Sequence, residues 1–143
     1  MENKFYKEPK NKLSPQQAWD EFLNFKKEEG GLSRLLEKAV KYIFSKGYNK
    51  KIYPLDYSHQ ALRLLKTKDL VATRAEIFLF EKENWFVSPE KFLADYLIEF
   101  KPEGVKWDEE EKTIKKEFNE PELESILDEF IGELLKSRIN GQG

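Results

Sequence analysis

The chain has 143 residues, with no cysteine and a single histidine, His59. The lack of cysteine excludes disulfides, thiolate metal sites and a cysteine nucleophile. One histidine cannot form a two-histidine metal site or a histidine relay within one chain. The GxGxxG, GxxxxGK and GxSxG patterns of nucleotide-binding proteins and serine hydrolases are also absent. We therefore expect no cofactor, no metal site and no enzymatic activity.

Long apolar runs are missing too, since the longest comprises only residues 77–80. A transmembrane helix needs about 20 apolar residues, and the polar N-terminus lacks the apolar stretch of a signal peptide. We expect a cytoplasmic protein without membrane contact. The chain is 39% hydrophobic, enough to bury a core without disulfides or metals. Residues 1–12 are polar and lysine-rich and are expected to form a flexible arm, and 13–143 a single globular domain.

Positive and negative charges are sorted along the chain. Residues 1–75 contain 16 Lys and Arg against 9 Asp and Glu, whereas residues 76–143 contain 9 against 18. The net charge of −2 therefore conceals a basic half and an acidic half. Because opposite charges attract, this pattern suggests an anionic partner for the first half and a basic or protein partner for the second.

The spacing of apolar residues predicts an α+β fold, a mainly helical single domain of about five helices with one small β-hairpin. Serine caps, two of them followed by proline, mark several helix starts, and apolar stripes at helical spacing follow them. The five helices are expected at about 14–28, 32–46, 58–68, 88–101 and 121–139.

The segments between these helices carry weaker strand signals. Residues 47–57 are expected to be extended, and 76–81 and 85–87 to form the hairpin. A helix over 73–83 is an alternative, because short apolar runs fit both periods. The apolar residues at 105–107 and 113–114 give a second small hairpin as a further alternative.

The C-terminal helix has an unusually wide apolar stripe. Its centre follows a 4-3-4 spacing at Leu123, Leu127, Phe130 and Leu134. We expect the stripe to close the core of its own domain, because most amphipathic helices do so. The alternative is that the helix pairs with a protein partner or a second copy of the chain.

Carboxylates offer only short matches to metal-dependent chemistry. Asp95 and Glu99 would share a face of the expected fourth helix, and Glu110–Lys112 resembles part of a nuclease strand. In a chain so rich in Glu and Lys, such matches arise by chance, and a solvated charged face is the preferred interpretation. A carboxylate-metal nuclease is thus a distant third hypothesis.

Basic and aromatic residues gather between positions 46 and 74. Lysine and arginine can neutralise phosphates while tyrosines stack on or bond to nucleic acid. The alternative is that the cations only solubilise the domain and the tyrosines belong to the core. The candidate nucleic-acid-binding residues from this pattern are Lys46, Tyr48, Lys50, Lys51, Tyr53, Arg63, Lys66, Lys68 and Arg74.

Residues 61–71 are similar to the end of a recognition helix leading into a strand, and 77–80 with 85–87 are similar to the wing that follows. On these features, the stretch 32–88 resembles a winged-helix nucleic-acid-binding domain. The resemblance implies groove contacts from Ser58, Gln60, Arg63 and Lys66, and wing contacts from Arg74 and Lys82. The chain departs from the family pattern at 47–57, which leaves little room for the family's second helix.

Taken together, these patterns predict a small, non-enzymatic, nucleic-acid-associated regulator or accessory subunit that contacts DNA or RNA through its basic and aromatic surface. The alternative is a protein–protein interaction module, of the inhibitor or immunity type, that acts through the acidic C-terminal half. The C-terminal helix would provide any protein contact or self-association.

Overall fold

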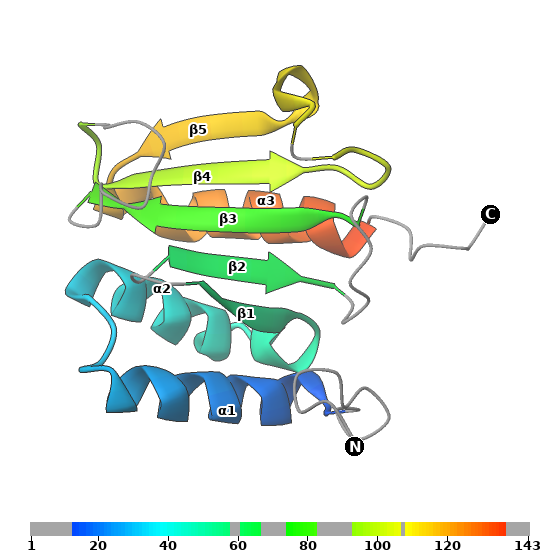
Figure 1. The fold of residues 1–143 in the computed structure, drawn as a ribbon. Helices are drawn as coiled ribbons and strands as arrows, with labels where there is room; N and C mark the ends of the chain where they lie inside the picture. Colours follow the sequence, from blue (N-terminus) through cyan, green and yellow to red (C-terminus); the bar gives the residue numbers. More distant parts are fainter. Residues whose placement is uncertain (1–12, 58–60, 67–73, 83–92, 107, 137–143) are drawn as a thin grey trace.

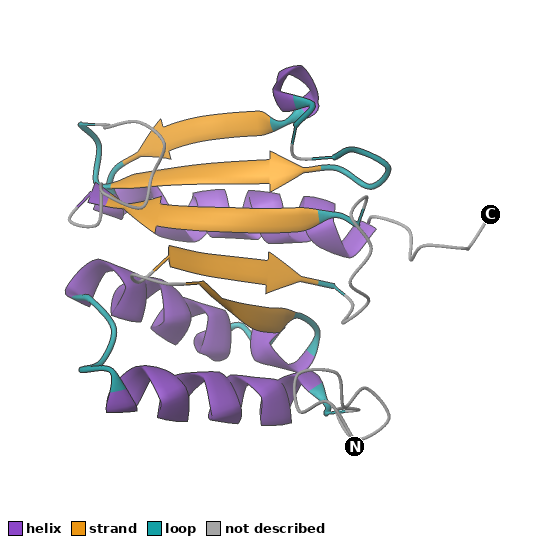
Figure 2. Cartoon of the chain, viewed as in Figure 1, coloured by secondary structure: helices purple, strands orange, loops and turns teal. Residues whose placement is uncertain are grey.

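The computed structural model describes residues 13–57, 61–66, 74–82, 93–106 and 108–136. Within these ranges, two α-helices precede a five-stranded sheet, and a third follows it (Figures 1 and 2). The helices are α1 (Pro15–Glu28), α2 (Arg34–Ser45) and α3 (Leu123–Lys136), and the strands are β1 (Tyr53–Tyr57), β2 (Ala61–Leu65), β3 (Glu76–Glu81), β4 (Tyr96–Lys101) and β5 (Ile114–Phe118). Short 3-10 helices occupy Tyr48–Lys50, Glu110–Lys112 and Glu120–Glu122.

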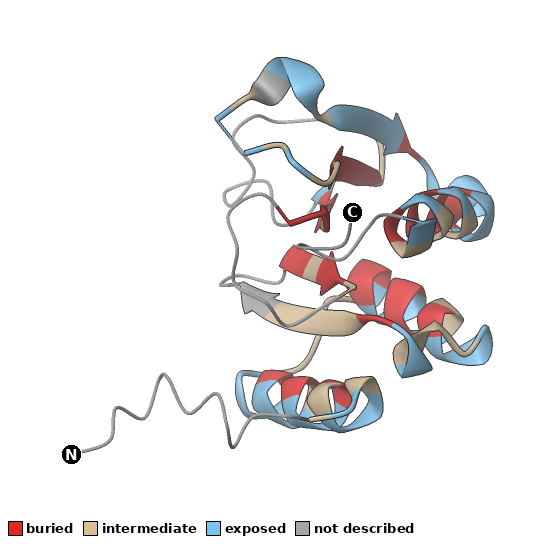
Figure 3. Cartoon of the chain, turned by 90° about the vertical axis from the view of Figure 1, so that its right-hand side faces the viewer, coloured by how far each residue is buried: buried red, intermediate tan, exposed pale blue. Residues whose placement is uncertain are grey.

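The sheet is an antiparallel meander in which each strand pairs with the next along the chain. Helices α2 and α3 lie against one face, while α1 lies beside α2 along the edge strand β1 (Figures 1 and 3). We call the face of the sheet that α2 and α3 cover the helix face, and the opposite face the open face. Side chains alternate between the two faces along each strand, so register decides which residues meet.

Local sequence explains where the first two helices begin and end. The Ser14 hydroxyl accepts a hydrogen bond from the Gln17 N–H, and the Gln17 side chain accepts one from the Ser14 N–H, at 3.2 and 2.9 Å. This capping box and the proline that follows it fix the start of α1. Gly31, at a φ of 90°, ends the turn after α1 in a conformation that favours glycine. Ser33 then caps α2 through the Leu36 N–H.

The main core lies between the helix face and the three helices. Trp19 of α1 is fully buried, and its indole N–H donates to the Ile52 carbonyl at 3.0 Å. The hydroxyl of Tyr96 on β4 donates to the Leu35 carbonyl of α2 at 2.7 Å. Phe100 of β4 meets Phe130 of α3 edge to face, with ring centroids 6.5 Å apart. Each layer is thus joined to the next by large buried rings, and two of these rings satisfy a buried carbonyl.

The apolar stripe of α3 is confirmed as part of this core. Its buried members are Leu123, Ile126, Leu127, Phe130, Ile131 and Leu134. The stripe is wide because it packs against both the sheet and α2. These side chains are buried in the protein's own core, as expected from the sequence.

The predicted fold class is wrong. The described residues form three α-helices and a five-stranded antiparallel sheet, not about five helices with one small hairpin. The expected third helix is strand β2, and the described end of the expected fourth helix is strand β4. Both strands are buried on both faces, so β2 is a nearly continuous apolar run without the alternation that marks a strand, and β4 shows that alternation only from Ile98 to Lys101.

Other expectations about the elements fared differently. The helices at the N-terminus, the strand at 76–81 and the C-terminal helix are confirmed, with bounds shifted by a few residues. The described residues of 73–83 form strand β3, not the alternative helix. The described residues of 105–107 and 113–114 do not form a second hairpin, although residue 114 begins β5. The run that the winged-helix resemblance takes as a recognition helix contains β2. Two expectations lie outside the described residues: the arm at 1–12 and the second strand of the hairpin at 85–87.

None of the helices in the described ranges combines the length and the apolarity needed to cross a membrane.

Candidate binding surfaces

The predicted nucleic-acid-binding residues do not converge on one surface. Ser58, Gln60 and Lys68 lie outside the described residues. The other nine occupy three places: the open face of the sheet, the ends of β2 and β3, and the corner between α2 and β1. Each place positions its cations against different neighbours, and those neighbours decide whether a cation is available for a ligand.

On the open face, two predicted cations are held by one carboxylate. Arg63 of β2 is bonded to Glu76 of β3, and the Arg74 Nε lies 3.5 Å from the same carboxylate. The Arg63 guanidinium also stacks over the Phe78 ring, 4.8 Å from its centroid. Glu76 is 1% exposed and Arg74 is 7% exposed. Both arginines therefore belong to a buried network, where they satisfy Glu76 before any ligand.

The network continues to β4 and β5 through residues that sequence reasoning missed. Lys101 is fully buried and donates hydrogen bonds to the carbonyls of Arg74 and Val105, the second at 2.7 Å. Burial lowers the pKa of Lys101 below its ordinary value. Glu99 lies 3.9 Å from Lys115. The alternation of Glu99 with Lys101 inside an apolar strand was the available signal, because such charges need cross-strand partners.

Tyr53 of β1 also belongs to the open face, since it pairs with Leu65 of β2 and is half-buried. One register row crosses the whole face, from Leu55 through Arg63, Phe78 and Glu99 to Lys115. Apolar Phe78, Phe80, Leu97 and Ala61 form a small cluster beside the charges. The open face thus combines ion pairs with aromatic contacts.

The cations at the strand ends are also engaged. The Lys66 ammonium, just after β2, donates to the Leu135 carbonyl of α3 at 2.9 Å. Lys82, just after β3, forms an ion pair of 2.9 Å with Asp95. Lys66 therefore satisfies a carbonyl in the last turn of α3, where a positive charge is favoured. Lys82 ties the end of β3 to the residue before β4.

Three predicted lysines are exposed at the corner formed by the end of α2, the 3-10 turn and the start of β1: Lys46, Lys50 and Lys51. The ion pairs of the described residues include none of them. Their neighbour Tyr48 faces inward, where its hydroxyl donates to Asp128 of α3 at 2.7 Å. The corner therefore offers charge, while its aromatic ring is already used in packing.

Asp128 accepts a second hydrogen bond from Tyr42, at 2.8 Å. Burial and these bonds to the carboxylate raise the pKa of both tyrosines to about 12. Burial alone would raise the pKa of Asp128, but the two hydroxyls and nearby Lys46 hold it below its ordinary value. This cluster joins α2 and the 3-10 turn to α3.

The two carboxylates considered for metal chemistry are separate. Asp95 precedes β4, and Glu99 stands four residues along an extended chain, a distance of about 13 Å. The backbone N–H of Glu120 and the Lys82 ammonium lower the pKa of Asp95. Among the described residues, no group of three His, Asp or Glu could hold a metal ion.

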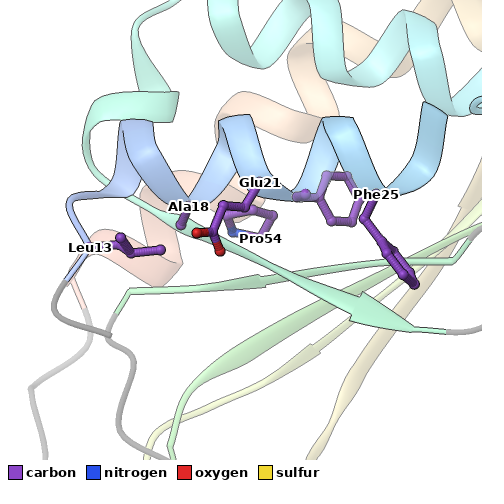
Figure 4. Close-up of a pocket in the computed structure, with 6 residues that line it drawn as sticks. Leu13, Ala18, Glu21, Phe25 and Pro54 are labelled. Carbon is purple, nitrogen blue, oxygen red and sulfur yellow. The ribbon is translucent and has the colours of Figure 1, made fainter. Parts of the chain in front are cut away.

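Another feature is an apolar groove between α1 and the edge strand β1, with a volume of about 440 Å³. We call it the α1–β1 groove (Figure 4). Its lining consists of Leu13, Ala18, Glu21, Phe22, Phe25 and Pro54. Phe25 retains 45% of its surface in solvent, although Phe22 beside it is buried. The sequence signal was Phe25 in the apolar stripe of α1, but its partner Pro54 could not be read from α1 alone.

Comparisons of this chain with family models, curated proteins and solved structures returned no match.

Proposed function

We propose that the protein is a non-enzymatic protein-interaction module that docks an apolar segment of a partner protein in the α1–β1 groove. The observation that carries this proposal is the half-exposed Phe25 ring at an apolar groove. Large exposed aromatic side chains next to apolar depressions are typical anchors of protein interfaces. A protein-interaction module was the alternative interpretation of the sequence, which assigned the contact to the acidic C-terminal half and not to this groove.

The environment of the cations supports this choice over the nucleic-acid hypothesis. Arg63, Arg74, Lys66 and Lys82 each contact a carboxylate or a carbonyl of the protein itself. A cation that already has a buried partner gains little from a phosphate, because the first partner must be given up. Of the predicted basic surface, Arg63 and Arg74 therefore belong to an internal network, and Lys66 and Lys82 already have partners within the protein.

The charge around the groove defines the partner further. Glu21 belongs to the groove lining, and both it and the adjacent Asp20 are exposed. A carboxylate in the lining of an apolar groove favours a partner segment with a basic residue among its apolar anchors. The partner is thus expected to present apolar side chains and a Lys or Arg that meets Glu21.

A selection experiment tests the proposal without a known partner. The purified full chain is used to select from a displayed library of random 16-residue peptides, and binding is measured on the enriched peptides. We expect apolar peptides with Lys or Arg to be enriched, and Phe25→Asp to weaken their binding at least tenfold. Ile114→Asp is the matched control, because Ile114 is 51% exposed on the opposite edge strand, β5.

Two outcomes would contradict the proposal. One is that no peptide is enriched above a non-binding protein. The other is that enriched peptides bind the Phe25→Asp protein as well as they bind the Ile114→Asp protein. Either result would remove the groove as a docking site.

Nucleic-acid association is the second candidate, favoured by the exposed Lys46, Lys50 and Lys51. Three phosphate contacts predict a slope of about −3 in a plot of log affinity against log salt for duplex DNA. Replacing all three lysines by Glu should abolish retention of DNA or RNA at low salt. If the unaltered protein retains no nucleic acid at low salt, this candidate is rejected.

A further inference from the structure

We infer that the α1–β1 groove takes an amphipathic α-helix of the partner, aligned along α1, with a Lys or Arg that pairs with Glu21. This inference rests on the proposed function and specifies the shape and charge of the docked segment. It follows from three features of the described residues: the length of the groove, the chemistry of its strand edge and the position of its carboxylate.

The groove is elongated along α1. Ala18, Phe22 and Phe25 are spaced i, i+4 and i+7, which places them on one face of the helix. At 1.5 Å per residue, the distance from Ala18 to Phe25 along the helix axis is about 10 Å. Figure 4 shows Ala18 and Glu21 beside Pro54, with Leu13 at one end of the row and Phe25 at the other. A row of this length matches about two turns of a second helix packed alongside.

The strand edge beside the groove does not favour an added strand. β1 is the edge of the sheet, and Pro54 is its second residue. Proline has no backbone N–H, so a strand added to this edge would lack one ladder hydrogen bond. Natural sheets use proline at edges for this reason. A helix satisfies its own backbone hydrogen bonds and needs only side-chain contacts.

The position of Glu21 sets the charge of the docked helix. Glu21 follows Ala18 by three residues and precedes Phe25 by four, so its carboxylate lies in the apolar row. Asp20 is equally exposed but is not part of the lining. A partner cation placed between two apolar anchors would meet Glu21 and leave Asp20 in solvent. Asp20 is therefore a matched control for Glu21.

The test uses the tightest peptide selected against the full chain. A proline at the centre of the peptide should weaken binding at least tenfold, because it breaks a helix. Alanine replacement along the peptide should give losses at a spacing of three or four residues. Glu21→Lys should weaken binding at least fivefold, and reversal of the peptide's basic residue to Glu should restore it. Asp20→Lys should change binding less than twofold.

Several results would overturn the inference while leaving the proposed function intact. A peptide that tolerates central proline, or that shows losses at every second residue, binds as an extended segment. Equal effects of Glu21→Lys and Asp20→Lys would remove the specific ion pair. A concentration-dependent dimer of the unaltered protein, abolished by Phe25→Asp in sedimentation, would identify a second copy as the occupant. If no peptide is selected at all, the proposed function itself fails.

Discussion

In the three central strands, β2, β3 and β4, both faces of the sheet are largely buried, but by different physical means. On the helix face, Leu64, Ile77, Leu79 and Ile98 pack against the helices in an apolar core, and buried Glu81 lies at the end of β3, opposite Tyr96. On the open face, alternate residues of the same strands form the charged network centred on Glu76. Low exposure in the sheet therefore does not imply an apolar residue, and charge does not imply an exposed one.

This difference separates the source of stability from the source of register. Apolar burial contributes about 25 cal/mol for each Å² removed from water, whereas a buried ion pair roughly balances its desolvation cost. We therefore expect the helix face to supply most of the stability. Because Arg63 must meet Phe78 and Glu76 at the same time, we expect the open face to specify how β2 and β3 align.

The largest effect is expected on the helix face. Phe130 is 5% exposed and packs edge to face on Phe100. Phe130→Ala should lower the free energy of unfolding by about 3–5 kcal/mol, because it removes a buried ring and leaves a cavity. Urea denaturation measures this loss. Ile114→Ala, at a half-exposed position, should change stability by less than about 0.5 kcal/mol. A folded variant of unchanged stability would show that α3 is not required by the core.

The open face is expected to respond next. Glu76→Ala leaves two arginines without their shared carboxylate, so we expect a loss of about 3 kcal/mol in the free energy of unfolding. Arg63→Ala should cost less, because Arg63 is partly exposed. The double variant should be more stable than the sum of the two losses predicts, by at least about 0.5 kcal/mol. Additive losses would show that the network does not act as a unit.

The comparison of the faces also explains which elements the sequence could predict. α1, α2 and α3 each bury one stripe, so their 3.6-residue period was visible. β3 was recognised from its apolar centre between two glutamates. β2 was taken for a helix because burial on both faces removed the alternation, and β4 because Phe92, Tyr96 and Phe100 repeat every four residues, as in a helix.

The misassigned strands also limited what the sequence could predict about the candidate binding surfaces. The basic residues were visible in the sequence, but their partners are cross-strand neighbours, and an incorrect strand assignment hides them. Arg63 and Glu76, for example, are 13 residues apart and meet only because β2 pairs with β3. Phe25 follows Ala18 and Phe22 at helical spacing in the sequence. That the stripe continues into a groove with Pro54 follows only from the position of β1.

At alkaline pH, the open face should change the free energy of unfolding through Lys101 before the tyrosines of the helix side titrate. Burial lowers the pKa of Lys101, with Arg74 acting in the same direction and Glu76 opposing it. Between the lowered pKa and the ordinary value of 10.5, the unfolded chain binds more protons, so this group makes stability rise with pH. Lys101→Met should remove that contribution from a plot of unfolding free energy against pH. Curves that stay parallel below pH 10.5 would contradict the expected role of Lys101.

The last effect appears only above pH 10 and comes from the tyrosine pair on the helix side. The pKa of Tyr42 and Tyr48 is raised to about 12 from an ordinary value of 10, because burial and Asp128 favour the neutral phenol. Their contribution to stability is fully present below pH 10 and is lost as the pH rises towards 12. The helix side should thus respond to alkali in the opposite sense to Lys101. Tyr42→Phe with Tyr48→Phe should flatten the fall between pH 10 and 12, measured by urea denaturation at each pH. Tyrosinate absorbance should show two fewer late-titrating groups in the same variant. An unchanged fall in stability, with early titration of both groups in the unaltered protein, would show that Asp128 does not hold the two hydroxyls in solution.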